Sequence, residues 1–299
     1  MVAGMIRLQN LSFRYPRSES PVLQRVSLEI AAGEFALVCG PTGSGKSTLI
    51  KTFNGLAPHF TGGELSGQVF IAGEDVTGRQ PHQLAEVLGY VNQQPEGSFV
   101  AEIVRDELAY GMEQLGFEVT EMSKRVESIA ERLDIADLLD NKMADLSGGQ
   151  QQRVAIGAAL AAGQKILVLD EPTSALDPEA ALGVVMLLRK LADESGVTVV
   201  LIEHRLERVI DQADSLVVVN GDGSVSKGSV SSQINNYRLV PPMVELSQKL
   251  KWPEVPVNLT DARRLWLANR AQIAVTGRFA SGEMNPASST PLLKATDIA

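Results

Sequence analysis

Hydrophobic and polar residues alternate along two stretches near the start of the chain, 6–13 and 22–30, and this alternation predicts half-buried strands. Continuous apolar runs such as 35–39 and 166–169 predict strands that are covered on both faces. The full set of predicted strands is 6–13, 22–30, 35–39, 165–170, 197–202 and 216–219. Helical spacing of apolar residues lies between them, at 49–56, 121–139 and 180–192. Strands that alternate with helices predict an α/β fold with a parallel sheet flanked by helices.

The pattern also divides the chain. Residues from about 94 to 158 are mostly helical in pattern and separate two strand-rich parts, so we interpret them as an inserted helical subdomain. Beyond residue 225 the periodicity weakens and the charge changes sign, since 226–299 carry nine Lys/Arg against five Asp/Glu. We therefore expect a main domain at 1–225 and a small C-terminal extension at 226–278. In the extension, Pro241-Pro242 opens a short helix, and Thr260 or Asp261 caps another that reaches Ala268.

Residues 279–291 have the composition of a linker, and 293–299 repeat the pattern of 6–12. Two explanations remain open: a chance match of seven residues, or the start of a second copy of the main domain that is cut short here.

Composition narrows the function classes. The chain has 299 residues and a net charge of −9, which argues against free-standing, non-specific binding to nucleic acid. We expect no membrane span, because no apolar run approaches the ~20 residues that one requires. The single cysteine, Cys39, excludes an internal disulfide and a multi-cysteine zinc site. The first residues show no secretory signal, and a reducing cytoplasm fits.

A phosphate-binding loop is the first chemical motif. Gly40-x-x-x-x-Gly45-Lys46-Ser47 follows a predicted buried strand and precedes a predicted helix, as this loop requires. Glycines let the backbone wrap around phosphates, Lys46 reaches the β- and γ-phosphates, and the Ser47 hydroxyl can bind Mg²⁺. The candidate nucleotide-binding residues here are Gly40, Pro41, Thr42, Gly43, Ser44, Gly45, Lys46, Ser47 and Thr48.

Two carboxylates end the apolar run at 166–169. Asp170 is placed to hold Mg²⁺ directly or through water, and Glu171 is placed to orient and deprotonate an attacking water. A solvated strand end is the ordinary alternative, but the four apolar residues before this pair and the sequence Pro-Thr-Ser-Ala-Leu-Asp after it favour the catalytic interpretation.

Leu146-Ser147-Gly148-Gly149-Gln150 lies between the phosphate loop and the Asp-Glu strand, and Ser147 can cap a helix that begins near Gly149. With these motifs in this order, residues 5–225 resemble the ATP-binding cassette family of ATPases. The resemblance implies a P-loop (RecA-like) core, an inserted helical subdomain and an N-terminal antiparallel β region. It also implies ATP and Mg²⁺ as ligands.

The resemblance assigns further roles by position. Tyr15 matches the aromatic residue that stacks on adenine, and Gln93 rather than Gln94 matches the glutamine that reaches the metal and the attacking water. The metal-binding candidates are therefore Ser47, Gln93 and Asp170. His204 matches the histidine that contacts the γ-phosphate, and Asp177 matches a loop aspartate that communicates between two ATP sites.

The signature motif implies a pair of cassettes. In the family, the residues matching Ser147, Gly148, Gly149 and Gln150 cover the γ-phosphate bound by a second cassette, because a helix N-terminus attracts an anion. That second cassette is a homodimer partner, a heterodimer partner or a fused copy. Closing on ATP and opening after hydrolysis supply the power stroke.

The segment 90–111, together with 53–60 and 240–247, is similar to the energy-coupling-factor (ECF) subgroup. That similarity implies a peripheral protein on the cytoplasmic face of the membrane that drives import of a vitamin or metal ion. Its implied partners are a transmembrane coupling protein, which 93–112 would contact, and a membrane substrate-binding subunit. In the subgroup the C-terminal extension helps to pair the two ATPases, which would suit 230–270.

Two alternatives share the core motifs. A conventional importer or exporter ATPase differs in its membrane partner. Soluble members that act on DNA or ribosomes carry long coiled coils, zinc cysteines or a basic linker, and these features are absent from the sequence.

Overall fold

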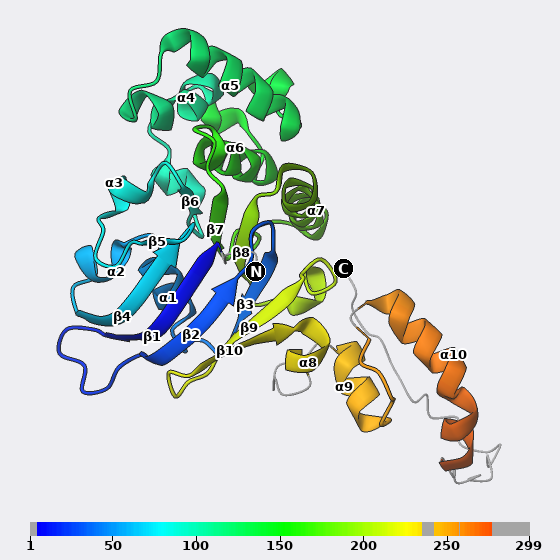
Figure 1. The fold of residues 1–299 in the computed structure, drawn as a ribbon. Coiled ribbons are helices and arrows are strands. Elements are labelled where there is room, and N and C mark those ends of the chain that lie inside the picture. The colour runs from blue at the N-terminus through cyan, green and yellow to red at the C-terminus, as the bar shows by residue number, and fades with distance from the viewer. Residues whose placement is uncertain (1–4, 235–241, 257, 277–299) are drawn as a thin grey trace, which may run out of the picture.

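Two β-sheets with helices between and around them make up the body of the chain (Figure 1). The computed structural model describes residues 5–234, 242–256 and 258–276. Sheet A is antiparallel, with the order β2-β1-β4-β5. Its strands are β1 (Ile6–Arg14), β2 (Leu23–Ile30), β4 (Glu64–Ile71) and β5 (Glu74–Asp75).

Sheet B has the order β10-β9-β3-β8-β7-β6, and all its neighbours are parallel except β9 and β10. Its strands are β3 (Phe35–Cys39), β6 (Leu88–Val91), β7 (Ile166–Asp170), β8 (Thr198–Ile202), β9 (Ser215–Val219) and β10 (Val225–Ser229). The phosphate-loop strand β3 is central, between β9 and β8.

The helices are α1 (Lys46–Phe53), α2 (Leu56–His59), α3 (Pro81–Leu84), α4 (Val104–Gln114), α5 (Val119–Arg132), α6 (Gly148–Leu160), α7 (Pro178–Ser195), α8 (Val230–Ile234), α9 (Pro242–Lys249) and α10 (Leu259–Thr276). Short 3₁₀ turns lie at η1 (Pro95–Ser98), η2 (Ala136–Leu138), η3 (Met143–Asp145) and η4 (Leu206–Arg208). Helices α4, α5 and α6 follow β6 in sequence, precede β7, and form the group at the top of Figure 1.

The two faces of sheet B are buried in two different cores. Ala36 and Val38 of β3 pack with α1 and with the inner face of sheet A, whereas Leu37 and Cys39 belong to a core that continues into α4–α7. Burial on both faces explains why the parallel strands are continuously apolar in sequence. The predicted α/β fold with a parallel-rich sheet and an antiparallel β region is confirmed.

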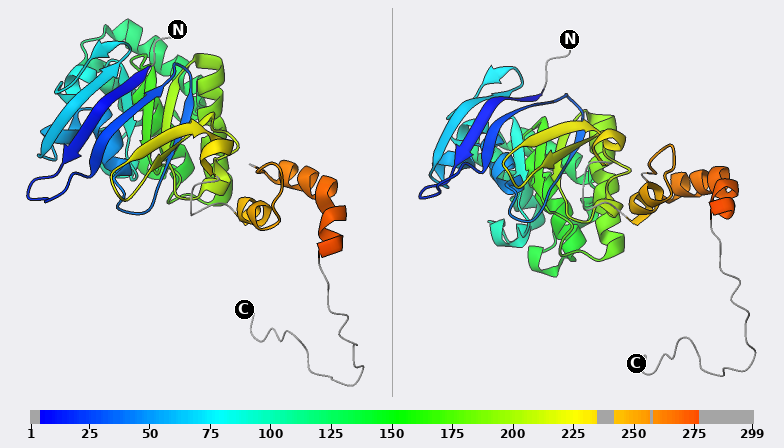
Figure 2. Two further views of the ribbon diagram at one scale, coloured as in Figure 1. Left: turned by 60° about the horizontal axis from the view of Figure 1, so that its bottom comes forward. Right: turned by 90° about the horizontal axis from the view of Figure 1, so that it is seen from below.

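The C-terminal extension begins with α9, whose Val244 is fully buried in the core that also contains β9 and α8. Figure 2 shows sheet A on one side of the body and α9 and α10 on the opposite side. The predicted boundary after residue 225 falls at the first residue of β10, so sheet B continues to Ser229. The proposed linker at 279–291 and the repeat at 293–299 lie outside the described residues.

The helix predicted to reach Ala268 continues to Thr276, and two other predicted helix ends are also wrong. The helix predicted to reach Leu139 ends at Arg132, because Asp134 takes a left-handed φ of 54° and the chain then forms the 3₁₀ turn η2, of which Leu138 is buried. The last helix is capped by Asn258, whose Oδ1 accepts the Asp261 N–H at 2.8 Å, rather than by Thr260 or Asp261.

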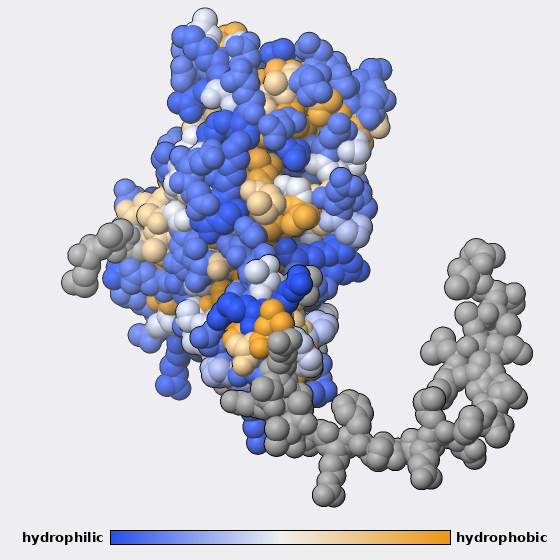
Figure 3. Space-filling model, turned by 90° about the vertical axis from the view of Figure 1, so that its right-hand side faces the viewer, coloured by the Kyte–Doolittle hydropathy of each residue, from blue (hydrophilic) through white to orange (hydrophobic). Residues whose placement is uncertain are grey.

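Seen from the side that carries α7, the surface is mostly hydrophilic with small hydrophobic clusters (Figure 3). Helix α7 exposes two apolar residues one turn apart, Leu182 and Met186. Within the described ranges, no helix is both long enough and apolar enough to cross a membrane.

Candidate functional site

The residues predicted to bind nucleotide and metal and to act in catalysis lie together at one edge of sheet B. Strands β3, β8, β7 and β6 are parallel neighbours, so the segments that follow their carboxyl ends lie side by side. These segments carry the phosphate loop, His204, the Asp170-Glu171 pair and Gln93. Topology therefore brings together four segments that are far apart in the sequence.

The loop at 40–45 needs glycine at both ends. A Cβ on Gly40 would lie 2.3 Å from the carbonyl oxygen of Val219, and Gly45, which precedes α1, has a left-handed φ of 105°. The loop therefore enters helix α1 with its backbone N–H groups available at the helix N-terminus, where negative charge is favoured.

Lys46 is folded back over this loop. Its Nζ donates to the carbonyl oxygens of Gly40 at 3.0 Å and Pro41 at 3.1 Å. Burial lowers the pKa of Lys46, and the neighbouring carboxylates of Glu171 and Asp170 oppose that shift. Close by, the buried Ser44 Oγ has no hydrogen-bond partner among the described residues. An ammonium held by two carbonyls and an unpaired hydroxyl fit a site that takes up an anion.

Ser47 and Asp170 meet opposite the loop. Ser47 Oγ donates to Asp170 Oδ1 at 3.3 Å. A hydroxyl and a carboxylate are the hard oxygen ligands that Mg²⁺ prefers, so this pair fits the ion. The described part of the chain holds no group of three or more His, Cys, Asp or Glu residues with metal-site spacing.

The charge on Asp170 leads to a prediction about stability. Burial raises its pKa, the Ser47 hydrogen bond opposes this, and the neighbouring Glu171 adds to it. Ionised Asp170 therefore destabilises the nucleotide-free protein above the raised pKa, and this cost disappears as the pH falls below the ordinary aspartate value. We expect Asp170→Asn to raise the melting temperature by a few degrees at pH 8, and the gain should disappear as the pH is lowered toward the ordinary aspartate pKa. Thermal melts without nucleotide test this, with the exposed Asp211→Asn as control; an unchanged or lower melting temperature at pH 8 would contradict it.

Glu171 is held by two of the other predicted residues. Its Oε1 lies 2.7 Å from His204 Nε2, and its Oε2 accepts a hydrogen bond from Gln93 Nε2 at 3.2 Å. Glu171 also has a left-handed φ of 52°, which is uncommon for a residue other than glycine. Gln94 instead precedes the turn η1. The geometry thus brings Gln93, Glu171 and His204 together beside the loop.

Tyr15 extends the site beyond the phosphate loop. Its hydroxyl is hydrogen-bonded to Thr48 Oγ1 of α1 at 2.9 Å, and its ring packs edge-to-face on Phe13 with centroids 5.0 Å apart. Tyr15 is therefore fixed beside the helix that starts at Lys46.

The signature residues form a separate surface. Ser147 caps α6: Ser147 N donates to Gln150 Oε1 at 2.8 Å, and the reciprocal Gln150 N–H bond to Ser147 Oγ is 3.4 Å long. Asp177 likewise caps α7 through the N–H groups of Glu179 and Ala180. A hollow of about 440 Å³ between these helices is lined by Ser147, Gly149, Gln150, Arg153, Asp177, Glu179, Ala180 and Gly183.

Glu203 is a residue that the sequence patterns did not single out. It ends the apolar run of β8 and is buried, with 3% of its surface exposed. Its carboxylate contacts Thr173 Oγ1 and accepts the His204 N–H. A charged residue directly after a continuous apolar strand, beside His204, is the signal that could have identified it.

Comparison with known proteins decides the family. Residues 23–174 match the family model described as ABC transporter. An ABC transporter ATP-binding protein of Pyrococcus abyssi is 35% identical over 255 residues, which cover 83% of this chain and 91% of that protein. The chain belongs to the ABC transporter family. Its resemblance to ATP-binding cassettes is thereby confirmed, and members of this family are ATPases.

Longer relatives contain this cassette as a part. An ABC transporter ATP-binding protein of Streptomyces avermitilis is 44% identical over 273 residues, covering 91% of this chain and 49% of that protein. A Streptomyces coelicolor protein likewise contains the cassette as a part, because the matched region covers 48% of that protein. The chain thus spans about half the length of these curated relatives.

Solved structures share the cassette's fold. The structure of cbiO1 from Clostridium perfringens, described as part of the ABC transporter complex cbiONQ, has a TM-score of 0.71 and 26% identity. The matched region covers 83% of this chain and 96% of the cbiO1 chain. An ATP-binding cassette of an ABC transporter in its ADP conformation has a TM-score of 0.69 and 28% identity, covering 79% and 96%.

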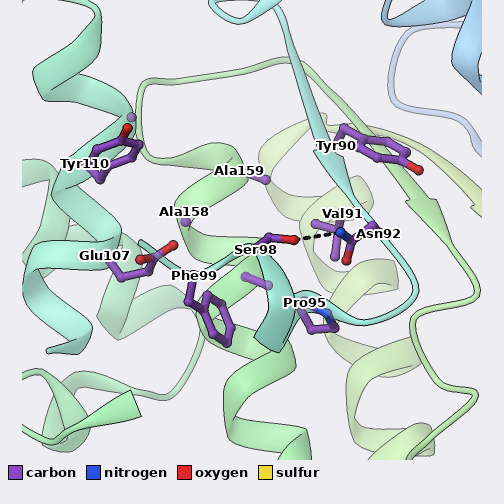
Figure 4. A pocket seen from close by; sticks show the side chains of 12 residues that line it. Tyr90, Val91, Asn92, Pro95, Ser98, Phe99, Glu107, Tyr110, Ala158 and Ala159 are labelled. Atoms are coloured by element: carbon purple, nitrogen blue, oxygen red, sulfur yellow. Dashed lines mark hydrogen bonds between the residues drawn. The ribbon is translucent and has the colours of Figure 1, made fainter. Parts of the chain in front are cut away.

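The cassette also has a groove between the segment after β6 and the helices α4 and α6. It measures about 330 Å³, and Figure 4 shows Phe99, Glu107 and Tyr110 among its lining side chains. Glu107 is buried and accepts the N–H groups of Val100 and Ala101, both at 2.8 Å, which fixes the segment at the rim. The groove thus combines apolar and aromatic walls with a rigid edge.

Proposed function

We propose that the cassette binds ATP with Mg²⁺ at the edge of sheet B and hydrolyses it. The observation that carries this proposal is the convergence of Gln93, Glu171 and His204 beside the loop that holds Lys46. Glu171 is the candidate base for the attacking water, and His204 is placed to contact the γ-phosphate. Tyr15 is the candidate platform for adenine.

Individual side chains would divide the work of binding. Lys46, Ser44 and the N–H groups of 40–48 would hold the phosphates, with Lys46 exchanging carbonyl partners for phosphate oxygens. Ser47, Gln93 and Asp170 would hold Mg²⁺, which neutralises charge on the phosphates.

We propose that hydrolysis takes two cassettes. Ser147, Gly149, Gln150 and Asp177 line the hollow between α6 and α7, whose lining residues include none of the phosphate loop, so one cassette would offer two half-sites. The N-terminus of α6, with Gly148 and Gly149, would cover the γ-phosphate of a partner cassette. The relatives of about twice this length support a fused partner as one option, beside a homodimer and a heterodimer.

We further propose that this ATPase powers an ECF-type importer of a vitamin or metal ion from the cytoplasmic face of the membrane. The similarity to the cbiO1 structure supports this subgroup. The groove lined by Phe99 and Tyr110 would receive the transmembrane coupling protein, which in turn would bind a membrane substrate-binding subunit. A conventional importer or exporter ATPase is the second candidate, since it shares every core residue.

Purification from membranes tests both the proposed ATP hydrolysis and the proposed membrane partners. The full-length protein is isolated in mild detergent, its companions are identified by mass spectrometry, and phosphate release is measured with Mg-ATP. A transmembrane protein with a separate substrate-binding membrane protein would support the ECF type, and transmembrane subunits without one would support the conventional type. Isolation with ribosomes or nucleic acid, or no ATP hydrolysis by the isolated assembly, would contradict the proposal.

The groove supplies a sharper prediction. Tyr110 is 37% exposed in the groove wall, so Tyr110→Ala removes aromatic contact area without emptying a core position. We expect this variant to lose most of its co-purifying membrane protein while its ATP affinity stays unchanged. Val119→Ala is the matched control, because Val119 is 74% exposed at the start of α5 and is not among the groove residues. Equal recovery of the membrane protein with Tyr110→Ala would exclude this groove as the contact.

A further inference from the structure

A buried carboxylate joins two segments of the site. Glu203 follows β8, and Thr173 follows the catalytic pair at the end of β7; the two side chains are 3% and 1% exposed. The Thr173 hydroxyl donates to Glu203 Oε1, and the His204 N–H donates to Glu203 Oε2 at 3.0 Å. Both carboxylate oxygens therefore bind donors, one from each segment, which offsets the cost of burying a charge.

These contacts close a ring. The chain runs from Glu171 through Pro172 to Thr173, crosses to Glu203 by a side-chain hydrogen bond, and continues to His204. The imidazole then returns to the start, because His204 Nε2 lies 2.7 Å from Glu171 Oε1. A ring of this kind leaves little freedom in the position of the imidazole relative to the carboxylate.

Thr173 also connects the ring to Asp177. The Leu176 N–H donates to the Thr173 carbonyl oxygen at 3.2 Å, and Asp177 follows directly as the cap of α7. The loop at 172–177 is therefore fixed at one end by Glu203 and at the other by α7.

We propose that Glu203 is a positioning residue that holds His204 and the loop at 172–177 in a fixed position relative to Glu171. It acts through Thr173 and the His204 backbone, because its two carboxylate oxygens already accept hydrogen bonds from these two donors. The inference rests on the proposed ATP hydrolysis, in which displacement of a catalytic group by even 1 Å is costly.

Steady-state kinetics of three variants test the positioning role of Glu203. Thr173→Val keeps the side-chain shape and removes the hydroxyl, so we expect kcat to fall about tenfold with the KM for ATP unchanged. Glu203→Gln keeps an oxygen for the His204 N–H and gains an amide that can donate to the Thr173 hydroxyl, so it should retain near wild-type kcat. Glu207→Gln, on an exposed carboxyl four residues later, is the control.

NMR provides a readout independent of turnover. The chain contains three histidines, so their ring signals can be assigned by substitution. In Thr173→Val the His204 ring signal should shift, while those of His59 and His82 stay in place. Wild-type kcat in Thr173→Val, an unmoved His204 signal, a parallel rise in KM, or failure of Glu203→Gln to retain activity would each overturn the inference. Absence of hydrolysis by the wild-type assembly would instead refute the proposed function itself.

Discussion

Glu171→Gln is expected to lower kcat by about 10²–10⁴-fold while leaving ATP affinity close to that of the wild type. The Glu171 carboxylate is the candidate base beside the phosphate loop, and its two oxygens face His204 and Gln93. Glutamine has nearly the same size and leaves Lys46 and the candidate Mg²⁺ ligands in place, but it cannot act as a base. ATP should then be bound and not turned over, so two cassettes stay closed around it.

Two measurements on the assembly with its membrane partners check this outcome. Steady-state phosphate release gives kcat, and gel filtration with Mg-ATP shows whether the closed pair accumulates. Glu194→Gln removes the same charge from the exposed end of α7 and should behave like the wild type. Normal turnover by Glu171→Gln would show that another group deprotonates the water.

The strands around the site could be predicted because burial on both faces leaves a plain sequence pattern. Strands β3, β7 and β8 contain uninterrupted apolar runs, and each run stops where the candidate site begins. The capping of α6 by Ser147 was also predictable, since a serine followed three residues later by glutamine is a local motif.

Other elements give weaker patterns. Strand β4 is mostly exposed, contains Gly67 and begins with Glu64, so it shows little alternation and was missed. Strand β6 has four residues and includes a glycine. The apolar spacing that continues past Arg132 reflects burial in the helical core, and burial alone does not require the chain to stay helical.

Contacts between residues far apart in the sequence could not be predicted from local patterns. Strands β7 and β8 are adjacent in sheet B, so the segments that follow them lie side by side. This adjacency allows Thr173 to contact Glu203. No local pattern pairs residues thirty positions apart. The motifs therefore predicted which residues carry the chemistry, while the fold was needed to show what holds those residues in place.

Lys46→Ala is expected to weaken ATP binding by about 10- to 100-fold and to reduce hydrolysis at least as much, because charge-assisted hydrogen bonds contribute ~1.5–3 kcal/mol. The Lys46 ammonium is buried, with its pKa lowered by that burial, and is held by the carbonyl oxygens of Gly40 and Pro41. A buried cation with neutral partners gains most from an arriving anion. The same variant leaves those two carbonyl oxygens without their donor, so the empty loop should also become less ordered.

Titration with a fluorescent ATP analogue gives the affinity, and hydrogen exchange at 40–45 reports the order of the empty loop. Lys190→Ala is the matched control: it removes the same charge from an exposed position on α7 and should leave both readouts unchanged. If Lys46→Ala bound ATP as tightly as the wild type, the loop would have to hold the triphosphate through backbone N–H groups alone. The site at the edge of sheet B would then owe its affinity to the N-terminus of α1 rather than to a buried cation.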